Sequence, residues 1–287
     1  MQMKPERTSK RRIEQAVLLE TTIQIKRVAG FPKHKEAINE DLKGKFLRTT
    51  AFIYREFLRT VIADIEYVYT SSLGLDPGQN GRVALSNLSR LLASGKGRFG
   101  SRQARREQLV IAAILDEFDE THVPPQRLIR FLEATVQEWV RDFFEVQFLD
   151  GTTAEIRCAL ELLDWAGELD DLKKCNPFPP PPRFPECVAR FLEERSDKVR
   201  LCEDAMRQPQ FRRKAAPILK VLDRMKNAAD DYDFANKLTP RTKGNWWLGD
   251  LLIALESPPI CAIYTTDGLF EALCGALGKR LYVGPVS

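Results

Sequence analysis

The sequence predicts an α/β fold in which a parallel sheet is interrupted by a region of helices. Three observations lead to this prediction. Short strand-like runs lie near both ends of the chain, and each is followed by residues with helical spacing, as in a sheet with crossover helices. The central half shows helical spacing only. The length of 287 residues is sufficient for two domains, or for one domain with a large insertion.

These patterns divide the chain into three parts. Residues 14–75 and 240–287 are expected to form one discontinuous domain around the sheet. Residues 76–239 are expected to be an all-helical insertion, and residues 1–13 a basic flexible tail.

Two strands and a long helix are predicted near the N-terminus. Residues 16–19 form a short apolar run that ends at Glu20, and residues 45–50 form a second extended stretch. From residue 51 onward, one helical face carries the apolar side chains Phe52, Ile53, Phe57, Val61, Ile65 and Val68.

Helices are predicted throughout the middle of the chain. Apolar residues recur at helical spacing in residues 110–118, 128–143, 156–163, 188–192 and 218–225. Residues 177–185 are rich in proline and are interpreted as a polyproline spacer. A flexible basic loop leading into a helix is predicted before residue 110, and it carries Lys96, Arg98, Arg102, Arg105 and Arg106.

The alternation of helix and strand returns after Pro240. Residues 247–255 show a helical stripe, and residues 261–266 form a β-rich run that stops at Asp267. A helix at residues 269–277 and a strand at residues 280–283 complete the chain.

The composition is that of a globular protein, with 44% apolar and 29% charged residues. No apolar run approaches the roughly 18 residues that a membrane span requires. The net charge of +4 equals that of residues 1–12, which hold five basic residues and one acid, so the remainder is neutral. This basic start lacks the apolar core of a signal peptide, so we expect a cytoplasmic protein without a membrane partner.

The six cysteines include no Cys-x-x-Cys pair, and we expect reduced thiols. Two interpretations stay open. The thiols are isolated core residues, or Cys158, Cys175, Cys187 and Cys202 ligate a metal cluster.

Four carboxylates are candidates for a functional site. Glu20 and Asp267 each follow a predicted strand, and ligands of parallel sheets bind beyond the carboxyl ends of strands. Glu56 lies on the apolar stripe of its helix, and Asp250 borders the packed side of another. Asp64 repeats the position of Glu56 two turns later and is interpreted as structural.

A carboxylate that faces a core costs several kcal/mol unless it is paired or bound to a cation. Clustered carboxylates suit Mg²⁺ or Mn²⁺, which share their coordination sphere with phosphate oxygens. The pattern therefore indicates metal-assisted hydrolysis of phosphodiesters.

Four segments, residues 17–23, 49–59, 249–254 and 263–270, together resemble the PIN-domain nucleases. Residues 17–23 (VLLETTI) resemble their first strand and acidic turn, and residues 49–59 resemble their second strand and acidic helix. Residues 249–254 (GDLLIA) are similar to the helix that carries the third acid. Residues 263–270 (IYTTDGLF) are similar to a strand, an acidic turn and an aromatic residue. The order is that of the family, and the similarity covers about a third of the chain.

This resemblance implies a three-layer α/β/α fold that binds Mg²⁺ or Mn²⁺ and cuts single-stranded RNA or structured nucleic acid. Glu20, Glu56, Asp250 and Asp267 would ligate the metal directly or through water, and Thr21 or Thr265 would hold the acids in place. One residue departs from the family, which usually has Asp where this chain has Glu20. Because Mg²⁺ demands near-ideal geometry, the longer side chain favours an alternative, an inactive scaffold or binding module.

Each acid also has a structural explanation. Asp267 would cap the following helix, and Asp250 would complement a helix dipole. Glu56 would pair with Arg48, Arg59 or Lys243, and Glu20 with Lys26 or the tail.

Basic and aromatic residues are candidates for binding RNA or another single-stranded nucleic acid. The basic loop, together with Arg207, Arg212, Arg213 and Lys214, would contact phosphates or would be a solvated surface. Lys243 is a further candidate, and Trp246 and Trp247 would stack on an unpaired base or pack in the core. The helical insertion is also a candidate surface for a protein partner.

Overall fold

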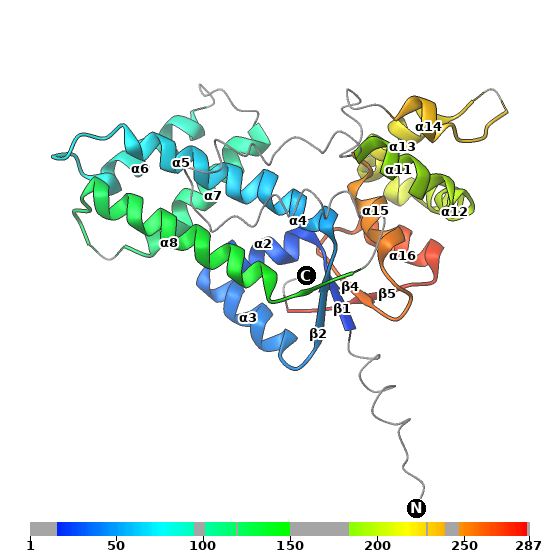
Figure 1. The fold of residues 1–287 in the computed structure, drawn as a ribbon, viewed down its shortest axis with the longest axis horizontal. Coiled ribbons are helices and arrows are strands. Elements are labelled where there is room, and N and C mark those ends of the chain that lie inside the picture. Colours follow the sequence, from blue (N-terminus) through cyan, green and yellow to red (C-terminus); the bar gives the residue numbers. More distant parts are fainter. Residues whose placement is uncertain are drawn as a thin grey trace, which may run out of the picture.

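A computed structural model describes residues 16–94, 101–118, 120–149, 184–227, 229–238 and 247–285, with the side chains of 101–107 and 109 excepted. At its centre is a five-stranded, all-parallel sheet of order β3-β2-β1-β4-β5 (Figure 1). The strands are β1 (Ala16–Leu19), β2 (Phe46–Thr49), β3 (Gln147–Phe148), β4 (Ala262–Tyr264) and β5 (Arg280–Tyr282). The predicted parallel sheet, formed by both ends of the chain, is confirmed.

Strand β1 occupies the middle of the sheet because all four of its residues are apolar and tolerate burial on both faces. The chain adds β2 and then β3 on one side of β1, and returns to add β4 and β5 on the other side. The direction of strand addition therefore reverses between β1 and β4. In parallel sheets this reversal is where ligands bind, next to the carboxyl ends of the strands.

Helices cover both faces of the sheet. Val17 and Leu19 pack with Ile23 and Ile38, which belong to α2 (Thr21–Ala29) and α3 (Pro32–Leu42). Leu18 points the other way, into a cluster with α15 (Gly249–Glu256) and α16 (Leu269–Leu277). Both of these helices are predicted from the sequence, whereas α2 and α3 are not.

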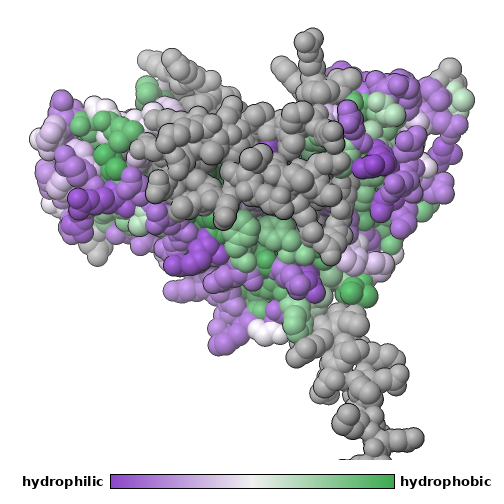
Figure 2. Space-filling view, viewed as in Figure 1, coloured by the Kyte–Doolittle hydropathy of each residue, from purple (hydrophilic) through white to green (hydrophobic). Residues whose placement is uncertain are grey.

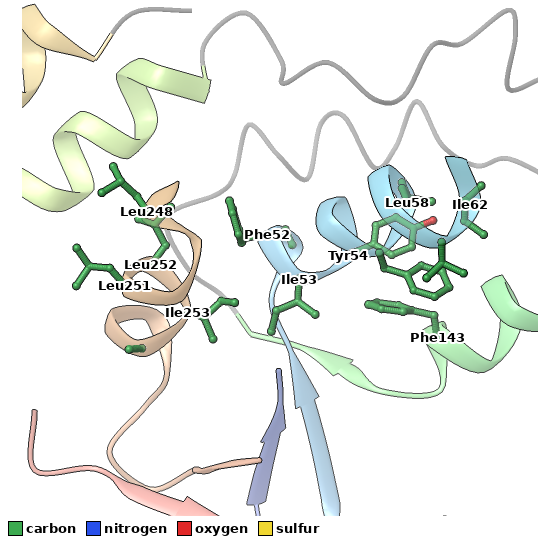
Figure 3. Packing of buried hydrophobic residues seen from close by; sticks show 14 of the residues in the cluster. Phe52, Ile53, Tyr54, Leu58, Ile62, Phe143, Leu248, Leu251, Leu252 and Ile253 are labelled. Carbon is green, nitrogen blue, oxygen red and sulfur yellow. The ribbon is translucent and has the colours of Figure 1, made fainter. Parts of the chain in front are cut away.

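The helix predicted from residue 51 consists of α4 (Ala51–Phe57), a π-helical turn (Leu58–Ile62) and α5 (Ala63–Leu73). Its start is set by Thr50, whose hydroxyl accepts a hydrogen bond from the Ile53 amide at 3.2 Å. Side chains of α4 face α15 on one side and α8 on the other, as Figure 3 shows. Tyr54 lies against Phe143 of α8, with 4.9 Å between the ring centroids.

The middle of the chain forms two groups of helices on opposite sides of the sheet (Figure 1). The first group contains α5, α6 (Gly81–Ala93), α7 (Ser101–Asp116) and α8 (Pro125–Phe144). The second contains α11 (Phe184–Glu193), α12 (Ser196–Met206), α13 (Pro209–Met225) and α14 (Phe234–Lys237). Hydrophilic residues are prominent on the outer sides of both groups (Figure 2).

The prediction that residues 76–239 are all-helical is wrong at β3. Gln147 and Phe148 follow α8 and pair with Arg48 and Thr49 at the edge of β2. Two residues are too few to show an alternating pattern, so only the pairing reveals the strand. The larger hydrophobic cluster also contains residues from both predicted parts, such as Leu222 of α13 and Leu273 of α16.

Four predictions fall wholly or partly outside the described residues. The basic tail at residues 1–13 and the helix at residues 156–163 are outside, and so are residues 95–100 of the predicted basic loop. The proline-rich segment is outside up to residue 183. Its last two residues, Phe184 and Pro185, begin α11 rather than a spacer. None of the described helices is long and apolar enough to span a membrane.

Candidate active site

The ends of β1 and β4 bring the first and last candidate acids together. The Glu20 amide donates to the carbonyl of Tyr264 at 3.0 Å, which extends the strand pairing one residue beyond β1. The Thr265 hydroxyl then donates to Oε2 of Glu20 at 3.3 Å. The loops that carry Glu20 and Asp267 are therefore neighbours at the point where the strand order reverses.

Glu20 is buried, with 5% of its surface exposed. Its two carboxyl oxygens accept hydrogen bonds from the hydroxyls of Thr22 and Thr265, each at 3.3 Å. Burial raises the pKa of Glu20 to about 7, and the negative charge of Asp250 contributes to the rise. The hydroxyl donors oppose this shift but do not cancel it.

Glu56 projects from α4 toward the same place. The Thr21 hydroxyl donates to Oε2 of Glu56 at 2.5 Å, so α2 and α4 are linked through this carboxyl. Burial raises the pKa of Glu56 to about 8, and the charges of Asp250 and Glu20 add to the rise. The Thr21 donor and the charge of Arg59 act in the opposite direction.

Asp250 lies in the first turn of α15, and its position depends on the preceding glycine. A Cβ atom on Gly249 would lie 2.7 Å from a ring carbon of Phe52 and 3.0 Å from Oε1 of Glu56. The missing side chain therefore lets α15 approach α4 and brings Asp250 beside Glu56. Burial, followed by the charge of Asp267, raises the pKa of Asp250 to about 6.

Asp267 is the most exposed of the four acids, with 44% of its side chain accessible. Its Oδ1 accepts a hydrogen bond from the Leu269 amide at 2.8 Å, at the start of α16. The same oxygen lies 3.6 Å from Nζ of Lys214 on α13. Asp267 therefore caps the following helix, as the sequence suggests, and this hydrogen bond uses one of its two carboxyl oxygens.

A cavity of about 640 Å³ lies next to these acids. One wall contains Glu56, Asp250 and Asp267. The facing residues come from α13, and they are Arg213, Lys214, Pro217 and Ile218. Trp247, which is 48% exposed, completes the lining. The cavity thus combines acids of the sheet domain with basic residues of the middle region.

The three more buried acids have no basic partner at contact distance in the described part of the chain. None of the ion pairs found there involves Glu20, Glu56 or Asp250. Arg48, considered as a partner for Glu56, donates to Gln147 instead. Asp64 is buried in α5 and does not line the cavity.

Other candidates lie outside the site or outside the described residues. Arg207 binds Glu203 and Asp223 and does not line this cavity. Arg212 lines a separate cavity on another side of α13. Lys96, Arg98, Lys243 and Trp246 lie outside the described residues, and so do the side chains of Arg102, Arg105 and Arg106.

The donor set suits a hard divalent cation, because every candidate ligand is an oxygen. Among the described residues, no three Asp, Glu, His or Cys side chains are arranged as a ready-made set of ligands for one ion. The described cysteines, Cys187, Cys202, Cys261 and Cys274, are buried, and Cys158 and Cys175 lie outside the described residues.

Comparisons with protein-family models, with curated proteins and with solved structures gave no match. The resemblance to PIN-domain nucleases stays a prediction.

Proposed function

We propose that this protein is a divalent-metal-dependent nuclease that hydrolyses phosphodiester bonds at the acid-lined cavity. One observation carries the proposal: Glu20, Glu56 and Asp250 are grouped with Asp267, and burial and mutual repulsion raise the pKa of the first three. Such a group is unfavourable when ionised, and a bound cation would offset the cost. Perturbed pKa values in a cavity are typical of functional sites.

Glu56, Asp250 and Asp267 would hold the cation, because they line the cavity, and Glu20 would support it from behind. When bound, Mg²⁺ or Mn²⁺ would stabilise charge on the phosphate and lower the pKa of a coordinated water. Thr21 and Thr265 would hold the carboxyls of Glu56 and Glu20 in position through their hydrogen bonds.

Hydrolysis forms a bond from a water oxygen to phosphorus and breaks the bond from phosphorus to the leaving oxygen. The water loses one proton and the leaving oxygen gains one. Burial raises the pKa of Glu56 to about 8 and that of Asp250 to about 6, and a bound cation would lower both values and keep the two carboxyls ionised.

RNA is proposed as the substrate rather than DNA, and the sheet domain is assigned to the PIN-like class. Both statements rest on the resemblance of residues 17–23, 49–59, 249–254 and 263–270 to PIN-domain nucleases. The acid cluster alone fits either nucleic acid.

The test is cleavage of end-labelled single-stranded RNA and DNA in Mn²⁺ by the native chain and by Asp250→Asn and Asp267→Asn. We expect Mn²⁺-dependent cleavage that falls by about a thousandfold in Asp250→Asn, because a carboxylate of the cation site is lost. Glu271→Gln is the matched control, since this exposed acid lies on α16 and does not line the cavity. Equal activity in the native chain and Asp250→Asn would exclude the proposed site.

A second candidate function is a non-catalytic binding module. It is favoured by the contact of Lys214 with Asp267, which supplies positive charge to the cavity without a metal. Calorimetry with Mn²⁺ separates the two functions. If the native chain binds Mn²⁺ and Asp250→Asn does not, the hypothesis of a binding module that lacks a metal is eliminated.

A further inference from the structure

The wall of the cavity that faces the acids has its own chemistry. Arg213 and Lys214 are consecutive, exposed residues of α13, and both line the cavity. They belong to the middle region, which lies outside the resemblance to nucleases. The acids of the cavity and these two basic residues are separated by more than 30 residues of chain in either direction.

The two walls are in contact through the pair formed by Lys214 and Asp267, with 3.6 Å between Nζ and Oδ1. A Cβ atom on Gly268 would lie 2.9 Å from the same Nζ. The glycine therefore gives the lysine room to reach the acidic edge. Both partners are about half exposed, and surface pairs of this kind contribute little to stability.

Trp247 adds an apolar surface to the rim. It is 48% exposed, although large aromatic side chains usually bury most of their surface. It precedes Asp250 by three residues and lines the same cavity. A half-exposed indole beside charged groups suits a flat ring that carries an anionic substituent.

The size of the cavity agrees with such a ligand. Its volume of about 640 Å³ falls within the range of roughly 300–1,000 Å³ that is typical of small-molecule sites. The phosphate of a nucleotide would approach a wall of carboxylates, which repels it unless positive charge is supplied from the other side. Arg213 and Lys214 supply that charge.

We propose that Arg213 and Lys214 position a phosphate group of the substrate and that Trp247 stacks on the adjacent base. The site would therefore bind a single-stranded nucleic acid. This inference rests on the proposed nuclease function. A base inside a duplex has both faces covered by its neighbours and cannot stack on Trp247. The middle region would therefore provide the substrate-binding half of the active site.

The first experiment measures binding of a fluorescent ten-nucleotide single strand by fluorescence anisotropy, in Ca²⁺ and in chelator, over a range of salt concentrations. The double variant R213A/K214A is expected to bind at least tenfold more weakly. Its salt dependence is expected to lose about 1.4 units of slope, because two phosphate contacts disappear. The matched control is R212A/K220A, which removes two charges from another side of α13, where both residues line a separate cavity.

Trp247 is tested with Trp247→Ala and Trp247→Phe. Loss of a stacked base is expected to weaken binding by about tenfold in Trp247→Ala, while Trp247→Phe keeps most of the affinity. A ten-base-pair duplex should bind equally to the native chain and to Trp247→Ala.

Kinetics in Mn²⁺ separate a positioning role from a structural one. R213A/K214A is expected to raise KM by at least tenfold and to change kcat by less. Equal losses of affinity in R213A/K214A and R212A/K220A would overturn the inference, because they indicate diffuse attraction only. Unchanged binding and KM, or no binding of the single strand by the native chain, would overturn it too. If the native chain binds as expected but cleaves nothing, the proposed function fails while the binding site stands.

Discussion

Two regions of this molecule bury carboxylates, and they do so in opposite ways. Glu203 on α12 is 2% exposed, and it accepts hydrogen bonds from Arg207, Lys226 and Tyr232. Burial alone would raise the pKa of Glu203, but these donors together hold it below its usual value. Behind the cavity wall, burial raises the pKa of Glu20 to about 7, because its neighbours are hydroxyls and another acid rather than basic side chains.

The difference distinguishes a structural acid, Glu203, from the acids that are candidates for a functional site. Glu203 is fully paired by side chains of the chain itself, so it requires nothing from solution. Among the described residues, Glu20, Glu56 and Asp250 have no ion pair, although hydroxyl groups donate to Glu20 and Glu56. Protonation would stabilise these three acids at low pH, and a nearby positive charge would do so at higher pH. A buried acid is thus informative about function when its partners are missing.

The largest effect on stability is expected at the paired site. Glu203→Gln leaves Arg207 and Lys226 without their shared carboxylate, and we expect a loss of about 2–3 kcal/mol of unfolding free energy. Asp250→Asn should instead raise the unfolding free energy in chelator at pH 8.5, because it removes a repelled charge. Urea denaturation measures both variants. A destabilised Asp250→Asn would show that the two regions do not differ in this way.

The acid cluster is expected to make the unfolding free energy depend on pH. The pKa values of Glu20, Glu56 and Asp250 are raised from 4.5, 4.5 and 3.8 to about 7, 8 and 6. Between these values the folded state binds more protons than the unfolded state, so the unfolding free energy falls as pH rises. The contribution is complete below about pH 4 and lost above about pH 8.

This dependence is measured by urea denaturation in chelator at pH 5.5 and 8.5. The native chain is expected to lose stability between the two, and Glu56→Gln is expected to lose less. Addition of Mn²⁺ at pH 8.5 should restore part of the loss. Identical pH profiles for the native chain and Glu56→Gln would contradict the prediction.

A smaller effect, about 1–2 kcal/mol, is expected from Gly249→Ala. The new methyl group would meet the buried ring of Phe52, so α15 must shift, and Asp250 shifts with it. We expect lower thermal stability together with lower Mn²⁺-dependent cleavage. The control is Gly275→Ala in α16, where a Cβ meets nothing within 4 Å and alanine favours the helix. If both variants are equally stable, the close approach of α15 and α4 is not required.

The smallest effect on stability is expected from Lys214→Ala. Its pair with Asp267 is half exposed, so the unfolding free energy should change by less than about 0.5 kcal/mol. A small loss would show that Lys214, unlike the basic partners of Glu203, contributes little to the unfolding free energy. A loss above about 1 kcal/mol would show that Lys214 is the structural cation of the acid cluster, and denaturation curves in chelator decide between the two.

The sequence alone was sufficient for the central strands, for most helices of the sheet domain and for the positions of the four acids. The spacing of apolar residues along a strand or helix is a local pattern. The strands at residues 16–19 and 262–264 can therefore be recognised without knowing which strands they pair with. The rule that ligands bind beyond the carboxyl ends of parallel strands then relates Glu20 to Asp267.

Other features were decided by tertiary contacts. Strand β3 forms because Gln147 and Phe148 pair with the edge of β2. Two residues are too few to show an alternating pattern, so the sequence does not indicate this strand. Gly249 matters because Phe52 lies against it. Arg213 and Lys214 face the acids because α13 returns to the sheet domain.

Glu203 and Glu56 illustrate the same limit, because each is an acid near apolar residues of a helix in the sequence. Only the structure decides that one meets Arg207 and Lys226 while the other meets Asp250 and Glu20. Local sequence determines which residues form a helix or strand and which face they occupy. The charge that stands opposite a buried acid comes from a distant part of the chain, so the ionisation of that acid is a property of the folded molecule alone.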